Sequence, residues 1–232
     1  AQLRDRLTEL EDERASLLLR LGTLELPSGV ASAQVGAIGR VNASSSNAEK
    51  VALFRTLFGA RSDVYAMRWE NAKSGRSGYA PACSNEWVAG ICNKPQIKCS
   101  ECLHQAFLPL SADVVERHLR GKSGNRADDF VAGAYPVSPD DTCWFLAADF
   151  DGDAWAADAL AYLQACRAKN VPAALERSRS GNGGHVWIFF AEPVLARDAR
   201  KLGSLLLTAA MECRPEIAFS SYDRLFPSQD VL

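Results

Sequence analysis

The sequence has 232 residues, of which 47% are hydrophobic, 23% charged and 9% aromatic. This balance excludes a disordered or collagen-like chain and allows one large domain or two small ones with a buried core. No apolar run reaches the roughly 18 residues of a membrane span and no signal peptide opens the chain, so we expect a cytoplasmic protein without a membrane segment.

The formal net charge of -2 conceals a segregation of charge along the chain. Residues 54–126 contain 11 basic and 6 acidic residues, whereas residues 127–160 contain 8 acidic residues and no basic one. A purely acidic stretch repels itself unless solvent or cations surround it, and the basic stretch suits a polyanion. The pattern favours metal ions that bridge protein and phosphate, with two solvated faces as the alternative.

Residues 1–26 are predicted to be a helix, because leucines recur every seven residues from Leu3 onward. Arg14 interrupts the second leucine row, so a short coiled coil, a helical hairpin and a plain docked helix stay open. Residues 27–47 are rich in Gly, Ser, Ala and Asn without a period, which predicts a flexible linker. We therefore expect one folded domain over residues 48–232.

The order of elements within that domain predicts an α+β fold. Helices are expected over residues 48–58, 111–121, 154–169 and 196–213, and strands over residues 64–69, 143–148, 171–176, 185–190 and 217–222. In the second helix, Ser111 is the expected N-cap and Gly121 the stop. Strands that alternate with helices from residue 143 onward are typical of helices packed on a sheet.

Asp149 and Asp151 come directly after the apolar strand 143–148. Residues two apart in a strand point to the same side, so both carboxylates meet while Phe150 faces the core. Two like charges held so close call for a divalent cation, and oxygen ligands select Mg²⁺ or Mn²⁺. Such a metal neutralises phosphates and activates a nucleophile. A surface turn is the alternative explanation of this D-x-D pattern.

The segment 176–185, ERSRSGNGGH, follows the acid pair after one helix and one strand. Its glycines allow backbone N–H groups to approach an anion closely, and its other side chains add hydroxyls and positive charge. A glycine-rich turn with incidental charges is the alternative. We predict a triphosphate cradle that consists of Arg177, Ser178, Arg179, Ser180 and His185.

A pair of metal ions calls for a third carboxylate, and the sequence offers two near its end. Asp223 is the preferred candidate because it follows an apolar stretch, as Asp149 does. Asp230, three residues past a proline, is the competitor. Arg224 is expected to contact phosphate or to pair with a neighbouring acid.

Four of the seven cysteines crowd into the stretch 83–104, whereas the other three lie apart. Their spacing, with one C-x2-C pair, predicts a structural tetrahedral zinc site, and His104 is an alternative to one thiol. A closed four-ligand site leaves no position for chemistry, so its role would be structural or in binding nucleic acid. The proposed ligands are Cys83, Cys92, Cys99 and Cys102.

Reduced, buried thiols are the alternative for these four cysteines, and they are the interpretation we give to Cys143, Cys166 and Cys213. Charged and aromatic residues around the zinc ligands suit contacts with a single-stranded template. These residues are Trp87, Asn93, Lys94 and Lys98. His118 is expected to be a surface residue.

Three segments, LAADFD, ERSRSGNGGHVWIFF and SYDRLFPSQD, occur in this order. Together they resemble the DxD, SxH and hD motifs of the archaeo-eukaryotic primase (primase-polymerase) superfamily. The residues of these motifs are most similar to those of the primase domain of TOTE conflict systems and of related CRISPR-associated primase-polymerases. FRTLFGARSDVYAMRW and GYAPAC, ahead of the cysteines, fit the same pattern, so the resemblance covers residues 50–230.

The resemblance implies an RRM-like catalytic core with a smaller α/β unit, and template-directed nucleotidyl transfer on single-stranded DNA or RNA from nucleoside triphosphates. Asp149 and Asp151 match the metal-binding pair and Asp223 the third acid, which implies two Mg²⁺ or Mn²⁺ ions. Ser180 and His185 match the pair that contacts the nucleotide's phosphates. The resemblance also implies fused or associated helicase or nuclease domains and a role in defence.

In that family a further segment follows the third motif, so we expect the catalytic domain over residues 48–232 to be truncated at its C-terminus. Three other functions stay open. One is an inactive zinc-containing module that binds single-stranded nucleic acid. Another is a metal-dependent nuclease, which leaves the triphosphate cradle unexplained. The last is an interaction protein built around the helix 1–26.

Overall fold

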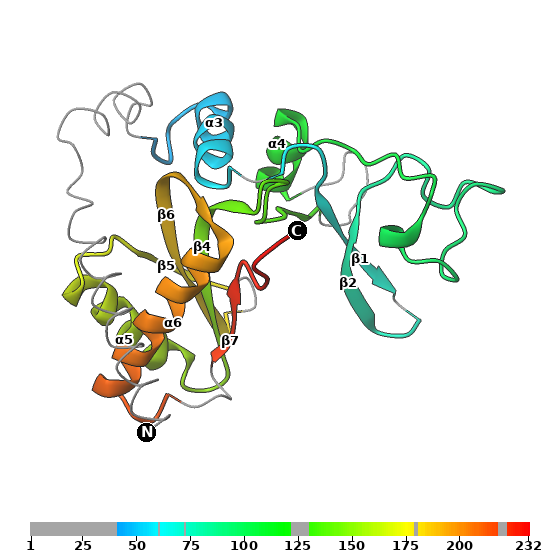
Figure 1. Cartoon of the computed structure of the whole chain (residues 1–232). Coiled ribbons are helices and arrows are strands. Elements are labelled where there is room, and N and C mark those ends of the chain that lie inside the picture. The colour runs from blue at the N-terminus through cyan, green and yellow to red at the C-terminus, as the bar shows by residue number, and fades with distance from the viewer. Residues whose placement is uncertain (1–40, 60, 72, 122–129, 179–180, 218–221) are drawn as a thin grey trace. The chain divides into compact units, whose positions relative to one another are not determined.

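The structure of the chain, a computed structural model, describes residues 41–59, 61–71, 73–121, 130–178, 181–217 and 222–232 (Figure 1). Within it, Ser46–Leu232 form one compact unit. The helix expected over residues 1–26 and most of the linker expected over residues 27–47 lie outside the described residues.

Helix α3 (Asn47–Leu57) opens the compact unit, and a capping box determines where it starts. The Ser46 hydroxyl accepts a hydrogen bond from the Glu49 N–H at 3.3 Å, and the Glu49 carboxylate accepts one from the Ser46 N–H at 2.8 Å. These two bonds satisfy backbone donors that a helix start leaves without partners. The helix begins one residue before the predicted position.

A small antiparallel sheet follows, with the strand order β2-β1-β3. It consists of β1 (Ala66–Asn71), β2 (Arg76–Pro81) and β3 (Ala132–Gly133). The first strand was predicted, but β2 was not, because its Gly, Ser and Arg residues lack an apolar pattern. Trp69 of β1 pairs with Gly78 of β2, and a Cβ at Gly78 would lie 2.9 Å from the indole. The glycine therefore lets the indole lie on the β2 backbone.

Helix α4 (Ala112–Arg120) packs on this sheet through Val114, which shares an apolar cluster with Tyr65 and Phe130. The Ser111 hydroxyl accepts a hydrogen bond from the Val114 N–H at 3.3 Å. Gly121 ends the helix in the left-handed conformation, with φ of 67°. Both predicted ends of this helix are confirmed.

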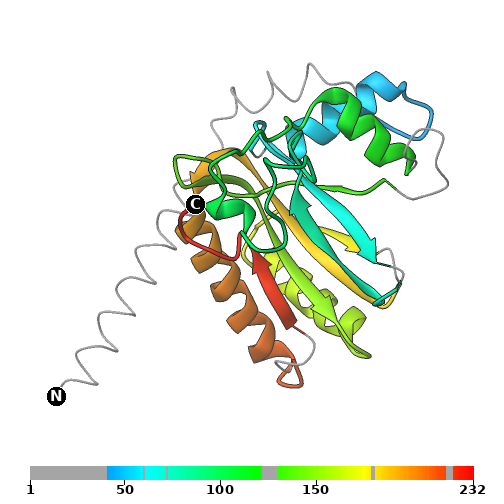
Figure 2. The same ribbon diagram turned by 90° about the vertical axis from the view of Figure 1, so that its right-hand side faces the viewer.

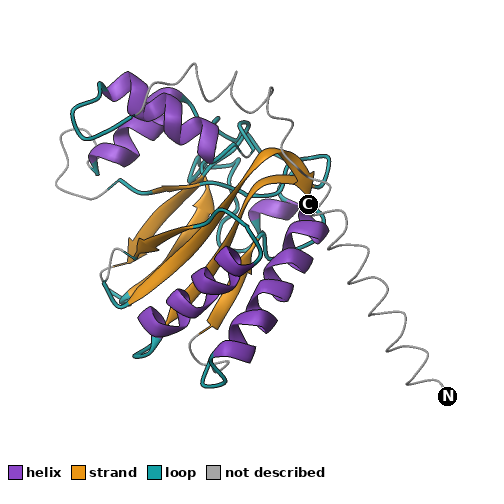
Figure 3. Cartoon of the chain, turned by 90° about the vertical axis from the view of Figure 1, so that its left-hand side faces the viewer, coloured by secondary structure: helices purple, strands orange, loops and turns teal. Residues whose placement is uncertain are grey.

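The larger sheet is antiparallel and has the strand order β5-β6-β4-β7. Figure 2 shows the red β7 at the edge of the sheet beside the yellow-green β4. Helices α5 and α6 lie against one face, as Figure 3 shows. The elements are β4 (Thr142–Asp151), α5 (Trp155–Ala168), β5 (Ala174–Arg177), β6 (Gly183–Leu195), α6 (Ala196–Cys213) and β7 (Tyr222–Phe226).

The main core lies between this sheet and the two helices. Alternate residues of β4, among them Leu146 and Phe150, point into it and are fully buried. Gly203 of α6 faces β7, and a Cβ there would lie 2.8 Å from the Leu225 side chain. The buried Asp158 of α5 forms an ion pair at 2.6 Å with Arg214, just after α6. The helices thus approach the sheet closely and are tied to one another.

The predicted α+β class is confirmed, since helices and two antiparallel sheets make up the described part of the chain. The last strand differs from its prediction over residues 217–222. Ile217 is buried in the core, but the strand is Tyr222–Phe226, in which Leu225 faces the helices. Asp223 therefore lies inside a strand instead of following one.

Candidate active site

The face of the larger sheet opposite α5 and α6 carries the predicted acid pair. Phe150 is fully buried, as the alternation predicts, so Asp149 and Asp151 of β4 point to the other face. Residues directly opposite one another on paired strands also share a face. A row of ionisable side chains therefore crosses the four strands at one level: Glu176, His185, Asp149 and Arg224.

Aromatic side chains cover the same face next to this row, starting two residues away, where Trp187 of β6 pairs with Ala147 of β4. The ring of Phe58, at the end of α3, lies 5.1 Å from Trp187, 5.6 Å from Phe145 and 5.6 Å from Phe189 between centroids. Trp187 and Phe189, two residues apart on β6, stack with their ring centroids 6.1 Å apart. Phe58, the residue just after α3, thus covers the apolar part of the face, and the ionisable row lies next to it.

His185 lies between two carboxylates. Its Nε2 atom is 3.4 Å from Asp149 Oδ1, and its Nδ1 atom is 3.4 Å from Glu176 Oε2. The pKa of His185 is raised, chiefly by Glu176, with burial opposing the shift and Asp149 adding to it. The pKa of Glu176 is lowered, chiefly by His185, with the Trp187 indole adding to the shift. Glu176 and Asp149 together thus favour the positively charged form of the His185 imidazole.

The turn between β5 and β6 is closed by backbone hydrogen bonds. The Ser178 N–H donates to the Gly183 carbonyl at 2.9 Å, and Gly181, with φ of 79°, donates to the Ser178 carbonyl at 2.9 Å. The Arg177 guanidinium donates through Nε and Nη2 to the Gly181 carbonyl at 3.2 and 3.1 Å. Arg177 thus braces the turn. Arg179 and Ser180, the other predicted members of the cradle, lie outside the described residues.

Gly183 lies directly under the second acid. A Cβ at this position would be 2.3 Å from Asp151 Oδ1 and 2.8 Å from the Phe150 carbonyl oxygen. The neighbouring Gly184 lies on the other side of the strand, where a Cβ would be 2.5 Å from the Trp155 ring. Gly183 and Gly184 therefore have packing roles that the sequence did not reveal.

The structure separates the two candidates for the third acid. In β7, Tyr222 pairs with Phe150 and Arg224 pairs with Asp149, with a register shift between the two pairs. The backbone of Asp223 therefore lies beside Asp149, although its side chain is outside the described part. The Arg224 guanidinium lies 5.8 Å from the centroid of the Phe226 ring.

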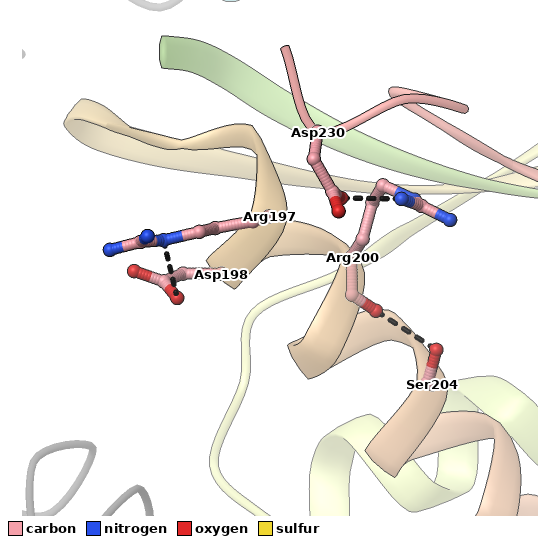
Figure 4. A network of polar contacts seen from close by, with 5 residues as sticks. All are labelled: Arg197, Asp198, Arg200, Ser204 and Asp230. Atoms are coloured by element: carbon pink, nitrogen blue, oxygen red, sulfur yellow. Dashed lines mark hydrogen bonds and ion pairs between the residues drawn. The ribbon is translucent and has the colours of Figure 1, made fainter. Parts of the chain in front are cut away.

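Asp230 lies at the opposite end of β4. Its carboxylate pairs with Arg200 of α6, near Arg197, Asp198 and Ser204 (Figure 4). Two residues later, the Leu232 N–H donates to Asp141, just before β4 begins, at 2.9 Å. Asp149 lies seven residues after Thr142, the first residue of β4. Roughly 23 Å of strand therefore separates Asp149 from the end of β4 near Asp230.

The four clustered cysteines, Cys83, Cys92, Cys99 and Cys102, line one cavity of about 170 Å³ together with His104. The His104 N–H donates to Cys102 Sγ at 3.4 Å. No three His, Cys, Asp or Glu side chains are already spaced around a metal position in the described part. The expected zinc site stays a prediction.

Two expectations about individual side chains, those for Cys213 and His118, need correction. Burial raises the pKa of Cys143 and Cys166 to about 11, but Cys213 is exposed at the end of α6. His118 is half-buried: its Nδ1 accepts a hydrogen bond from the Ala132 N–H at 3.2 Å, and burial lowers its pKa. Lys94 pairs with Glu86 at 2.6 Å, and its expected contact with a template stays a prediction.

Glu176 and Trp187 are the site residues that sequence reasoning missed. The Trp187 indole N–H donates to Glu176 Oε2 at 2.6 Å, and the same carboxylate faces His185. The sequence did contain one indication of Glu176: two short strands around a glycine-rich turn predict a hairpin, and a hairpin places residues 176 and 185 opposite one another. Without the register, Glu176 looks like an ordinary surface residue of an edge strand.

The fold and the site define an α+β domain with a row of ionisable side chains on one sheet face. The family model of the TOTE conflict system archaeo-eukaryotic primase domain matches residues 49–232, and the chain belongs to this family. The resemblance to this family is thereby confirmed. Proteins of this family are in general primase-like nucleotidyltransferases that act on nucleic acids and nucleotides.

A search of the curated proteins found no match. Among the helices of the described residues, none combines the length and the apolar character that a membrane span requires.

Proposed function

We propose that this chain catalyses template-directed nucleotidyl transfer, in which a 3′-hydroxyl attacks the α-phosphate of a nucleoside triphosphate and pyrophosphate leaves. One observation carries the proposal: Asp149 on β4 lies between His185 on β6 and the Asp223–Arg224 backbone on β7. Acids for metal ions and cations for phosphate thus come from three neighbouring strands. The family to which the chain belongs supports the same reaction class.

The donor set of this site fits Mg²⁺ or Mn²⁺. Carboxylate oxygens are the ligands these ions prefer, and Asp149 and Asp151 share one face of β4. Asp223 would join them from β7, next to Asp149. When bound, two such ions would neutralise the triphosphate and lower the pKa of the attacking hydroxyl. Asp149, Asp151 and Asp223 would hold them.

The remaining side chains of the row would bind and orient the nucleotide. The charge that Glu176 and Asp149 favour on His185 suits a phosphate oxygen. Arg224 lies on the other side of Asp149, where its guanidinium suits a second phosphate contact. The turn that Arg177 braces would present the Ser178 hydroxyl to the triphosphate. Catalysis would then be mainly positioning and charge neutralisation.

The direct test is extension of a labelled strand. The full chain is incubated with a primed single-stranded template, nucleoside triphosphates and Mn²⁺ or Mg²⁺, and the product lengths are measured. We expect products that lengthen only when a complementary nucleotide is supplied. Shortening of the labelled strand would contradict the proposal and favour a nuclease. Template binding without any change in length would favour a binding module.

Gly183→Ala should lower the extension rate about a hundredfold, since a displacement of about 1 Å at reacting groups costs that much. The added Cβ must push Asp151 or part the strands β4 and β6, because it would lie 2.3 Å from the carboxylate oxygen. Initial rates give the measurement. Gly133→Ala is the matched control, since its nearest neighbour would be at 3.4 Å. Equal rates for the two variants would show that Gly183 does not shape the site.

The hairpin of β1 and β2 supplies a surface for the template. Trp69 is 43% exposed and shares a face with Arg76, while Tyr79 is 58% exposed on the opposite face. Lys73 lies in the turn between the strands. Exposed aromatic rings stack on bases, and neighbouring cations attract the phosphate backbone. We propose that this hairpin, together with the residues around the four clustered cysteines, binds the template.

Trp69→Ala should raise the KM for template about tenfold, because stacking on one base contributes about 1–3 kcal/mol. The KM for the nucleotide should change little, since Trp69 lies outside the ionisable row. Steady-state extension at varied template concentration is the measurement. Leu119→Ala is the control: it also removes an exposed apolar side chain, but from α4, and it should leave the KM for template and the KM for nucleotide unaltered. A template KM unaffected by loss of Trp69 would remove the hairpin from the template path.

We also propose that the cysteine segment binds one structural zinc ion. The four thiols line one cavity, and the His104 N–H donates to Cys102 Sγ at 3.4 Å, which holds that side of the loop in place. The two ends of the segment are held together, because Cys83 pairs with Phe107 in a short antiparallel bridge. The thiols would move inward as the ion binds, as is common when binding and local folding are coupled.

Cys99→Ser should reduce bound zinc from one ion per chain to near zero and loosen residues 82–108. The reason is that a structural zinc ion contributes folding free energy to its loop. Elemental analysis measures the metal, and hydrogen exchange measures the loosening. Cys213→Ser is the control, since that thiol is exposed at the end of α6. Zinc-free wild-type protein with a protected segment would contradict this proposal.

A further inference from the structure

The imidazole of His185 faces a second carboxylate on the side turned away from Asp149. Its Nδ1 atom is buried without a well-directed hydrogen bond, and the carboxylate facing it is Glu176 Oε2 at 3.4 Å. The two residues are direct cross-strand partners on β5 and β6. The backbone register therefore brings this carboxylate to the ring, although half of the Glu176 side chain is exposed.

Glu176 is in turn anchored to the aromatic cluster. The Trp187 indole N–H donates to Glu176 Oε2 at 2.6 Å, the same oxygen that faces His185. Trp187 is itself fixed by edge-to-face contact with Phe58 at 5.1 Å and by stacking with Phe189 at 6.1 Å. A glutamate on an edge strand normally samples several rotamers, and this bond restricts it.

We infer that Glu176, held by Trp187, is a positioning residue that fixes the His185 ring so that its Nε2 side is turned to Asp149 and the nucleotide. Carboxylates that hold the second nitrogen of a functional imidazole fix its tautomer and its orientation. The inference rests on the proposed function only where it concerns the nucleotide. The orientation of the ring can be measured in protein without nucleotide or metal.

The first measurement is a long-range ¹H–¹⁵N correlation spectrum of the imidazole nitrogens in the full chain. The sequence contains three histidines, so the signals can be assigned by substitution. Glu176→Gln and Trp187→Phe should each shift or broaden the His185 nitrogen signals. His104, in the cysteine segment, is the internal reference, since His118 also senses the charge of Glu176. Glu192→Gln, which removes a charge elsewhere on β6, should leave His185 unchanged.

The second measurement is steady-state extension. Glu176→Gln should raise the KM for the nucleoside triphosphate about tenfold or more, as the loss of a residue that orients a ligand does. Trp187→Phe retains a smaller aromatic ring and removes the indole N–H that bonds to Glu176, so it should produce a smaller change in the same direction. The KM for template should stay the same in both variants. A residue that matters only for folding would not separate these two constants.

The outcomes are distinguishable. His185 signals that are the same in wild type, Glu176→Gln and Trp187→Phe would overturn the inference. So would an unchanged nucleotide KM in an active enzyme. Altered His185 signals in a chain that extends no primer would support the positioning role and contradict the proposed function.

Discussion

Asp149→Asn should reduce nucleotide incorporation about a thousandfold or more. The substitution keeps the shape of the side chain and removes the charge that would hold the metal ions, which contribute several kcal/mol of transition-state stabilisation. Asp149 lies at the centre of the ionisable row and its side chain is only 16% exposed. Initial rates of primer extension in Mn²⁺ provide the measurement.

The same variant should still fold, because the lost attraction to His185 at 3.4 Å is offset by relief of repulsion from the neighbouring Asp151. Its thermal midpoint in chelator should lie close to that of wild type. Mn²⁺ should raise the midpoint of wild type and have a smaller effect on the variant, since an ion that binds only the native state stabilises it. Asp198→Asn on α6 is the charge control. Extension by Asp149→Asn at the wild-type rate would exclude this mechanism.

Asp223→Asn and Asp230→Asn should have opposite outcomes. Asp223 lies in β7 between the residues that pair with Phe150 and Asp149, so losing its charge should lower extension about as much as losing that of Asp149. Asp230 pairs with Arg200 at the far end of β4, and its replacement should leave extension within about twofold, as surface ion pairs contribute little.

Both variants are measured by extension and by the shift of the thermal midpoint in Mn²⁺. The second readout detects loss of a metal ligand even where activity is low. An inactive Asp230→Asn beside an active Asp223→Asn would reverse the assignment of the third acid. Activity in both variants would mean that the site functions with the pair on β4 alone.

Sequence patterns predicted the local features well because short-range physics determines them. Ser111 and Gly121 bound α4 through a hydroxyl cap and a left-handed residue, which depend on adjacent residues only. The apolar run before Asp149 predicted a buried strand, and Phe150 is indeed in the core. Three short motifs in fixed order were sufficient to indicate the family.

Features that depend on which strands pair could not be obtained in this way. β2 has no apolar alternation and exists because it pairs with β1, where Gly78 accommodates Trp69. β7 starts five residues later than predicted, because Leu225 packs against α6 while Ile217 fills the core outside a strand. In both cases the long-range partner outweighs local propensity.

The candidate site shows the same division most clearly. The types of its acids, its histidine and its glycines could be recognised along the chain, since those residue types carry the chemistry. That Glu176 reaches His185, that Trp187 anchors Glu176, and that Asp223 lies beside Asp149 while Asp230 does not, came only from the tertiary structure. Strand register determines these neighbours, and register arises from burying whole sheet faces against helices far away in sequence.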